Sequence, residues 1–300
     1  NTTQGGLDGN VRDGRGPAIT VPSPEDSPRW EALPTLISDA KAEQATLREN
    51  AKPAFETWLG SLSHDQLDQS LPEKALIFHR PLNDRADESI TWADDGKLGP
   101  SPVIKKGSTI NLGDAGDFES DQGFSVSAWI KPGNARQNVS AIARMDVKNG
   151  HRGWDIYQQG KRISVHIIHQ WPESAIKVTT RDEVLKPNQW RHVSFTWDGS
   201  GKPNGVKLFI DGKEQKFNIN TKTLKPNRTI RTKVSLNVGQ RSEGQVFEGS
   251  VQDLRLYSRT LATAELSLIA NHGILREMLA VPAAKRSPEQ KEQLYEHYLH

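Results

Sequence analysis

Hydrophobic residues recur at every second position through most of residues 107–257, which is the pattern of β-strands with one buried face. The clearest example is segment 124–130, whose alternate residues are Phe124, Val126, Ala128 and Ile130. Strict alternation puts Trp129 on the opposite face, where either a β-bulge turns it inward or it lies on an outer sheet surface. Short strands of this kind, separated by glycine-rich turns, predict two antiparallel sheets packed face to face.

Strands are predicted at 75–78, 107–112, 124–130, 139–144, 153–158, 162–169, 189–197, 206–210, 213–219, 234–238 and 246–257. Between two of them, Asp211 and Gly212 form the central pair of a type I′ hairpin turn. The sequence therefore predicts a mainly β domain, a two-sheet antiparallel jelly-roll sandwich with helical flanks at both ends.

The flanks have helical spacing instead. Apolar residues from Leu33 to Leu47 predict one helix, and Phe55 and Trp58 belong to a second, short one. Capping boxes occur at 63–66 and 287–290, and a helix over 263–270 is expected to end at Gly273. The predicted division is a Gly/Pro-rich linker or strap at 1–29, a helical segment at 30–74, the sandwich at 75–271 and a C-terminal helical segment at 272–300.

Composition excludes several classes of function. Thirty-nine basic and 37 acidic residues give a net charge of +2, too small a field for nucleic acid or anionic lipid. A local basic cluster is expected to be a solvated loop rather than a polyanion site; it comprises Lys222, Lys225, Arg228, Arg231 and Lys233. The absence of cysteine excludes disulfides, thiolate metal sites and covalent haem attachment. No apolar run approaches the ~18 residues of a membrane span.

Four segments, 124–132, 189–199, 206–213 and 247–257, together resemble the laminin-G-like, concanavalin A-like jelly-roll family. Segments 1–10, 169–172 and 280–290 also resemble the middle of large planctomycete secreted cytochrome-type proteins, in which such a domain lies between two other regions. This resemblance implies a secreted or periplasmic location, neighbouring domains of the parent protein as partners, and no haem in this chain. The chain begins with asparagine rather than methionine, and we expect it to be a processed product or a piece of a longer protein.

A catalytic function is not expected, although glycoside hydrolases also use this fold. Retaining hydrolysis needs two carboxylates about 5 Å apart, which concanavalin A-like hydrolases place on one strand as Glu-x-Asp-x-Glu. Glu119 and Asp121 lack the third acid, and Asp253 is alone in its strand. The histidines His166 and His169 point to opposite faces of their strand and are poor joint metal ligands. His192 is expected to be a hydrogen-bonded structural histidine.

The family resemblance implies calcium as a candidate ligand, because laminin-G-like sandwiches often bind it at a sheet rim through oxygen donors. The candidate donors are Asp84, Asp87 and Asp253. The family pattern usually has Asp-Glu where this chain has Gln252 and Asp253, and a solvated acidic loop is the alternative.

A sugar site needs an aromatic ring for stacking and planar polar groups for the hydroxyls. The candidate ligand-binding residues are His169, Trp171, Tyr157, Trp154, Glu173 and Arg241. The alternative is that Trp171 caps the core edge and Pro172 ends the strand. The first hypothesis is a non-catalytic glycan-binding module of a larger secreted protein. The others are a purely structural interdomain or protein-interaction module and an atypical glycoside hydrolase.

Overall fold

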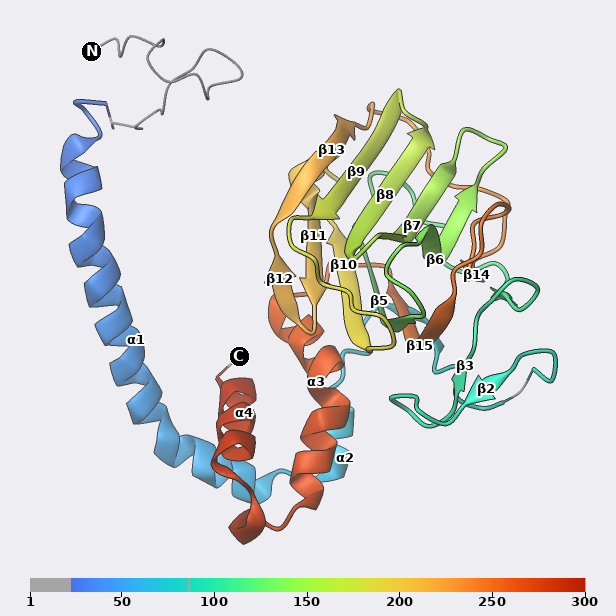
Figure 1. Ribbon diagram of the computed structural model, residues 1–300. Helices are drawn as coiled ribbons and strands as arrows, with labels where there is room; N and C mark the ends of the chain where they lie inside the picture. The colour runs from blue at the N-terminus through green and yellow to red at the C-terminus, as the bar shows by residue number, and fades with distance from the viewer. Residues whose placement is uncertain (1–22, 86, 300) are drawn as a thin grey trace, which may run out of the picture. The chain divides into compact units, whose positions relative to one another are not determined.

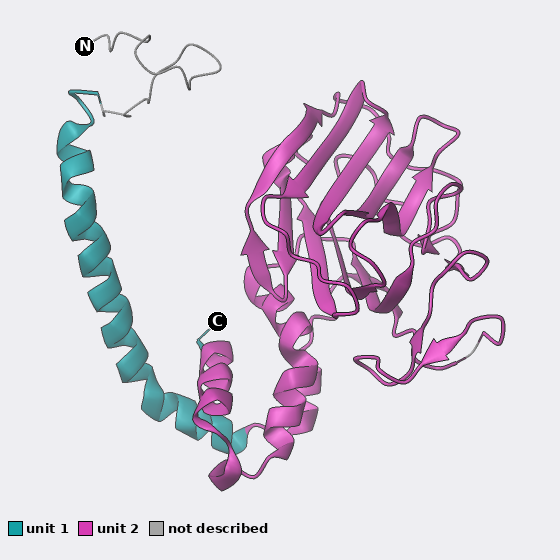
Figure 2. Ribbon diagram, in the orientation of Figure 1, with its two compact units in different colours: residues 1–61, 299 teal, residues 62–298, 300 magenta. Residues whose placement is uncertain are grey.

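The computed structural model describes residues 23–85 and 87–299. The chain divides into two units, one of residues 1–61 with Leu299 and one of residues 62–298 with His300, which Figure 2 shows in teal and magenta. Most of the predicted linker at 1–29 therefore lies outside the described residues. No helix in the described ranges is long and apolar enough to cross a bilayer.

The described part of the first unit is one helix, α1 (Ser27–Ser61). The prediction of two separate helices is wrong, because the chain continues helically through both Pro34 and Pro53. Each proline removes one backbone hydrogen bond without ending the helix. Several large apolar side chains of α1 are exposed; these are Trp30, Leu33, Leu36, Ile37 and Leu47.

In the second unit, two antiparallel sheets form the sandwich, as Figure 1 shows. In spatial order, the six-stranded sheet contains β1 (Leu76–Arg80), β15 (Gly249–Tyr257), β5 (Phe124–Pro132), β10 (Arg191–Trp197), β11 (Val206–Ile210) and β12 (Lys213–Gln215). The seven-stranded sheet contains β13 (Phe217–Thr223), β9 (Ser174–Thr180), β8 (Arg162–Gln170), β7 (Arg152–Gln159), β6 (Asn138–Asp146), β14 (Asn237–Val238) and β4 (Ile110–Asn111). A small ribbon pairs β2 (Trp92–Ala93) with β3 (Ser101–Pro102). The strands of the described residues confirm the predicted mainly β sandwich.

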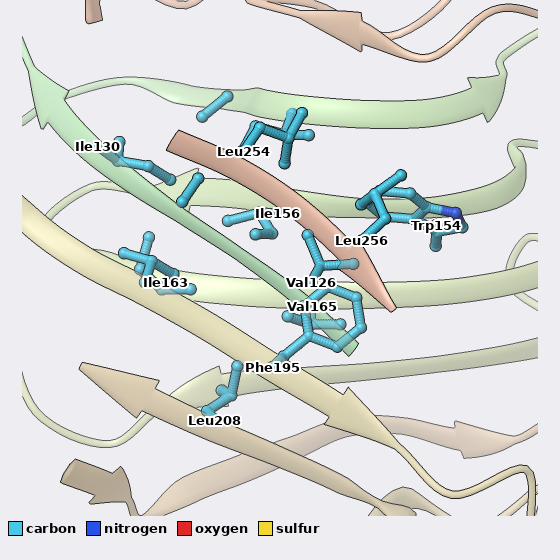
Figure 3. Packing of buried hydrophobic residues seen from close by; sticks show 14 of the residues in the cluster. Val126, Ile130, Trp154, Ile156, Ile163, Val165, Phe195, Leu208, Leu254 and Leu256 are labelled. Atoms are coloured by element: carbon cyan, nitrogen blue, oxygen red, sulfur yellow. The ribbon is translucent and has the colours of Figure 1, made fainter. Parts of the chain in front are cut away.

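The core lies between the two sheets and is built from the alternating apolar positions. Figure 3 shows Val126 and Phe195 of the six-stranded sheet packed with Ile156 and Val165 of the seven-stranded sheet. All four are fully buried. The aromatic rings interlock as well, with Phe124 stacked on Phe118 at 4.2 Å between ring centroids. The side chains that alternate with these core residues must therefore point to the two outer faces.

Helices cover one end of the outer face of the six-stranded sheet. The helix α3 (Thr263–Ala280) packs Leu266 and Ile269 against Phe209 and Tyr257. The prediction that this helix ends at Gly273 is wrong; Leu275 and Met278 continue the buried stripe beyond it. Helix α2 (His64–Gln69) and helix α4 (Pro288–Tyr298) begin at the two predicted capping boxes. Two short 3₁₀ helices lie at Pro203–Gly205 and Ala283–Lys285.

Two local predictions have clear outcomes. Asp211 and Gly212 both have positive φ, at 51° and 76°, as a type I′ hairpin requires. Trp129 points to the outer face, where it is paired with His192 across the strands and is only 9% exposed. Strand β9 was not predicted, although Ile176 and Val178 alternate with the polar residues Lys177 and Thr179 along it.

Candidate functional site

The outer face of the seven-stranded sheet carries rows of polar side chains across neighbouring strands. These strands, β6 to β9, are green and yellow-green in Figure 1. On β7, β8 and β9, strand pairing places Asp155 opposite His166 and His166 opposite Lys177. The adjacent row consists of Ser140, Tyr157, Ser164 and Thr179 on β6 to β9. We call Asp155, Tyr157, His166, Lys177, Trp171 and Arg241 the outer-face site.

Asp155 anchors this site from a fully buried position. Its Oδ2 accepts hydrogen bonds from Ser140 Oγ at 2.5 Å and from Arg241 Nε at 2.9 Å. Its Oδ1 accepts one from His166 Nδ1 at 2.7 Å. Burial by itself raises the pKa of the Asp155 carboxyl, but the charge of Arg241 and these hydrogen bonds outweigh it and hold that pKa well below its usual range. Asp155 is therefore ionised and has no free oxygen for proton transfer.

His166 lies between two aromatic rings. Its ring meets Tyr157 edge-on at 5.3 Å and Trp171 edge-on at 5.9 Å between centroids. Burial lowers the pKa of His166 more than Asp155 raises it, so the imidazole is neutral at pH 7. A neutral ring that donates Nδ1–H to Asp155 is fixed in one orientation, and it holds the two aromatic residues in place.

Trp171 is the exposed aromatic group of the site. It lies in the turn between β8 and β9, with 38% of its surface exposed, and is followed by a cis peptide bond to Pro172. Its backbone N–H donates to the carbonyl of Gly150 at 2.8 Å, which fixes the turn to the loop between β6 and β7. The indole contacts His166 edge-on, and its exposed part is accessible to a ligand.

Two cations lie over Tyr157. The Arg241 guanidinium is 5.1 Å from the ring centroid, and the Lys177 ammonium is 5.9 Å from it. The loop that carries Arg241 is held to β6, because Ser242 N–H donates to the Met145 carbonyl at 3.0 Å. Burial lowers the pKa of Lys177, which lies on the half-buried floor of the site.

The structure brings together three of the six predicted ligand-binding residues: Tyr157, Trp171 and Arg241. Trp154 requires a correction. It alternates with Asp155 and Tyr157, so its side chain points into the core, where it is 1% exposed and donates Nε1–H to the Gly116 carbonyl at 2.8 Å. It cannot contact a ligand on the outer face.

The other two predicted residues do not join the cluster. His169 points to the opposite face from His166, as predicted, and its Nδ1 contacts the Thr229 carbonyl oxygen at 2.8 Å. Glu173 is exposed in the turn beyond Trp171.

Sequence reasoning missed Asp155, His166 and Lys177 as parts of the site. Each is a polar residue at an outward position of its strand. That alternation was visible in the sequence, but the pairing that aligns the three strands was not.

Each candidate calcium ligand interacts with different partners. Asp253 is 5% exposed and accepts hydrogen bonds from His79 Nε2 at 2.6 Å and Arg255 Nε at 3.1 Å. Asp84 pairs with Arg80 at 3.2 Å, and Asp87 accepts from the backbone and hydroxyl of Ser89. Within the described ranges, no group of three acidic or histidine side chains is arranged to hold a metal ion.

His192 also differs from its prediction as a hydrogen-bonded histidine. It is fully buried on the outer face of the six-stranded sheet, edge-on to Trp129 at 5.3 Å between centroids. Neither ring nitrogen has a hydrogen-bond partner in the part of the chain that the structure describes. Burial lowers the pKa of His192 to about 4.

Residues 105–267 match the family model of the concanavalin A-like lectin/glucanases superfamily. This match covers more than half of the chain, and the chain belongs to that superfamily. A search of curated protein sequences gave no match.

Among solved structures, the binding domain of Paraclostridial Mosquitocidal Protein 1 is similar with a TM-score of 0.52 and 15% identity, over 66% of this chain and 52% of that one. The binding domain of Botulinum neurotoxin serotype D is similar with a TM-score of 0.50 and 14% identity, over 67% of this chain and 52% of that one. This chain therefore spans about half the length of those domains. At such identities, the likeness establishes the fold.

Proposed function

We propose that the protein is a non-catalytic carbohydrate-binding module whose ligand lies on the outer-face site. The observation that carries this proposal is the exposed indole of Trp171 and the ring of Tyr157, which both contact the buried His166. Aromatic rings stack on the apolar face of a pyranose, while fixed polar groups bind its hydroxyls. Arg241 and Lys177 supply the donors next to the Tyr157 ring.

The chemistry of the site favours binding over hydrolysis. Hydrolysis of a glycosidic bond requires a protonated acid and a second carboxylate. The outer-face site contains one carboxylate, Asp155, which is ionised and fully engaged by Ser140, His166 and Arg241. A few stacked rings on an open sheet face give modest affinity, because ordering the ligand offsets much of the contact energy.

The test is affinity gel electrophoresis of the chain in gels that contain individual polysaccharides. We expect retardation by at least one polysaccharide, and we expect Trp171→Ala to abolish it without lowering the melting temperature. Trp30→Ala is the matched control, because Trp30 is 55% exposed but lies on α1. The proposal would be contradicted if Trp171→Ala still bound the polysaccharide, or if no polysaccharide retarded the chain. Release of reducing sugar would favour a hydrolase instead.

A structural role is the second candidate, and it is supported by the apolar side chains of α1. Trp30, Leu36 and Leu47 are each more than half exposed, as is common where another protein surface covers a helix. In this proposal, α1 packs on a neighbouring domain of a secreted or periplasmic parent protein. Replacement of the three residues by Gln should leave glycan binding unchanged and weaken that association.

A further inference from the structure

A groove of about 630 Å³ lies at the end of β6. Its lining comes from three segments, namely residues 134–139, residues 244–248 and Lys106. The side chains that line it are mainly amides and charged groups, above an apolar floor of Val139 and Val246.

Strand β6 links the groove to the outer-face site. Asn138 of the groove and Ser140, which donates to Asp155 of the site, are two residues apart on β6 and are paired with Gln159 and Tyr157 of β7. Alternate residues of a strand point to the same face and lie about 7 Å apart. Asn138 therefore faces the same side as the Ser140–Asp155 cluster. A ligand on Tyr157 that extends along β6 would enter the groove.

The walls of the groove are fixed before any ligand binds. The Gln137 amide bridges to the opposite wall, where its Oε1 accepts from Glu248 N–H at 2.6 Å and its Nε2 donates to the Glu248 carbonyl at 2.8 Å. Asn134 Nδ2 donates to the Glu248 carboxylate at 3.1 Å. A preformed polar groove loses less entropy on binding than a mobile one.

Positive charge is in excess along this path. Lys106 and Arg136 are exposed at the groove, and neither forms a salt bridge with a described residue. In the outer-face site, Lys177 likewise has no carboxylate partner among the described residues, while Arg241 pairs with Asp155.

Few carboxylates are available to balance these positive charges. Among the described residues, Asp155 of the outer-face site and Glu248 of the groove lining are already hydrogen bonded within the protein. A third, Glu173, is exposed in the turn beyond Trp171, at the end away from the groove. The two unpaired cations of the groove and Lys177 therefore favour a ligand with several negative charges.

We propose that the ligand is an acidic polysaccharide, bearing carboxylate or sulfate groups, that extends from Trp171 across Tyr157 into the groove between Lys106 and Arg136. This inference rests on the proposed function, and it adds the chemical class of the ligand and a second subsite. Recognition combines ring stacking in the outer-face site with charge pairing in the groove.

The test uses the full chain and pairs of polymers that differ only in charge. Polygalacturonate, alginate, hyaluronan and heparin are each compared with a carboxyl-reduced, esterified or desulfated form by affinity electrophoresis at 50 and 200 mM NaCl. At least one acidic polymer should bind at least tenfold more tightly than its neutral form, and binding should weaken with salt. The double variant Lys106→Gln/Arg136→Gln should weaken that binding about tenfold. The double variant Lys213→Gln/Lys216→Gln, at exposed positions outside the groove and the outer-face site, is the charge-matched control.

The outcomes separate this inference from the proposed function. Equal binding of acidic and neutral forms that still depends on Trp171 would overturn the inference and leave the module a glycan binder. The inference would also be overturned if Lys106→Gln/Arg136→Gln bound with unchanged affinity, or if Lys213→Gln/Lys216→Gln lost as much affinity. Single-stranded DNA that binds as tightly as the best acidic polysaccharide would show a general polyanion site instead. Failure of every polymer to bind would overturn both proposals.

Discussion

Replacing His192 by leucine should remove a large part of the acid sensitivity of the fold. His192 is fully buried on β10, where both ring nitrogens lack a partner among the described residues. Its pKa is lowered to about 4, chiefly by burial and further by Arg255, while Asp253 and Asp211 act in the opposite direction. The unfolded chain therefore binds a proton at this residue at a higher pH than the folded chain does.

The sign and size follow from linkage. Because the folded pKa lies below the unfolded one, the stability contributed by His192 is fully present above pH 6.5 and is lost as the pH falls from about 6.5 to about 4. A pH of 4.5 is about two units below the pKa of the unfolded histidine, which is therefore protonated. Each unit corresponds to about 1.36 kcal/mol of free energy of unfolding. His192 alone should therefore lower the free energy of unfolding by about 2 to 3 kcal/mol between pH 7 and pH 4.5.

Urea unfolding of the parent chain and of His192→Leu at both pH values measures this contribution. The comparison of two pH values within each variant removes the packing cost of the substitution itself. The parent should lose about 2 to 3 kcal/mol more than the variant on acidification. Ser194→Ala is the control, because Ser194 is a buried, uncharged neighbour on the same strand and should leave the parent's pH dependence intact. Equal losses in the parent and in His192→Leu would refute the reasoning.

Three further predictions concern the site and the core. Asp155→Asn should lower the free energy of unfolding by about 3–5 kcal/mol, because it leaves the mostly buried Arg241 charge without its partner. The exposed control Asp182→Asn should change that free energy by less than about 0.5 kcal/mol in the same urea titration, and equal effects would contradict the role of Asp155. Trp154→Ala should cost about 3–5 kcal/mol by opening a cavity in the core; a neutral effect would show that the indole is not a core residue. EDTA should leave glycan binding unchanged, since Asp155, the one carboxylate of the outer-face site, is already engaged by Ser140, His166 and Arg241; loss of binding on chelation would show a required metal.

The fold could be predicted largely from alternation. The positions 124, 126, 128 and 130 all face the core, and the hairpin at Asp211 and Gly212 has the expected backbone. Element ends were less predictable. A glycine is expected to end a helix where no buried contact continues beyond it. Beyond Gly273, Leu275 and Met278 supply such contacts, and the helix continues.

The candidate site could be predicted only in part. Trp171 was identifiable because a tryptophan next to a proline at the end of a strand must lie in a turn. Asp155 and His166 form one unit only through the register between β7 and β8, which depends on strand pairing that alternation does not specify. Trp154 was assigned to the site together with Tyr157, although the period of two puts these two residues on opposite faces of the strand.

The most direct test of the account is amide hydrogen exchange of the full chain with and without a polysaccharide that retards it in a gel. Glycan binding on the outer-face site predicts added protection in the turn at 171–173 and in the loop at 239–244, with little change at α1 or at the small ribbon of β2 and β3. Protection confined to α1, to the β2–β3 ribbon or to the end of the sandwich near Asn227 would contradict it.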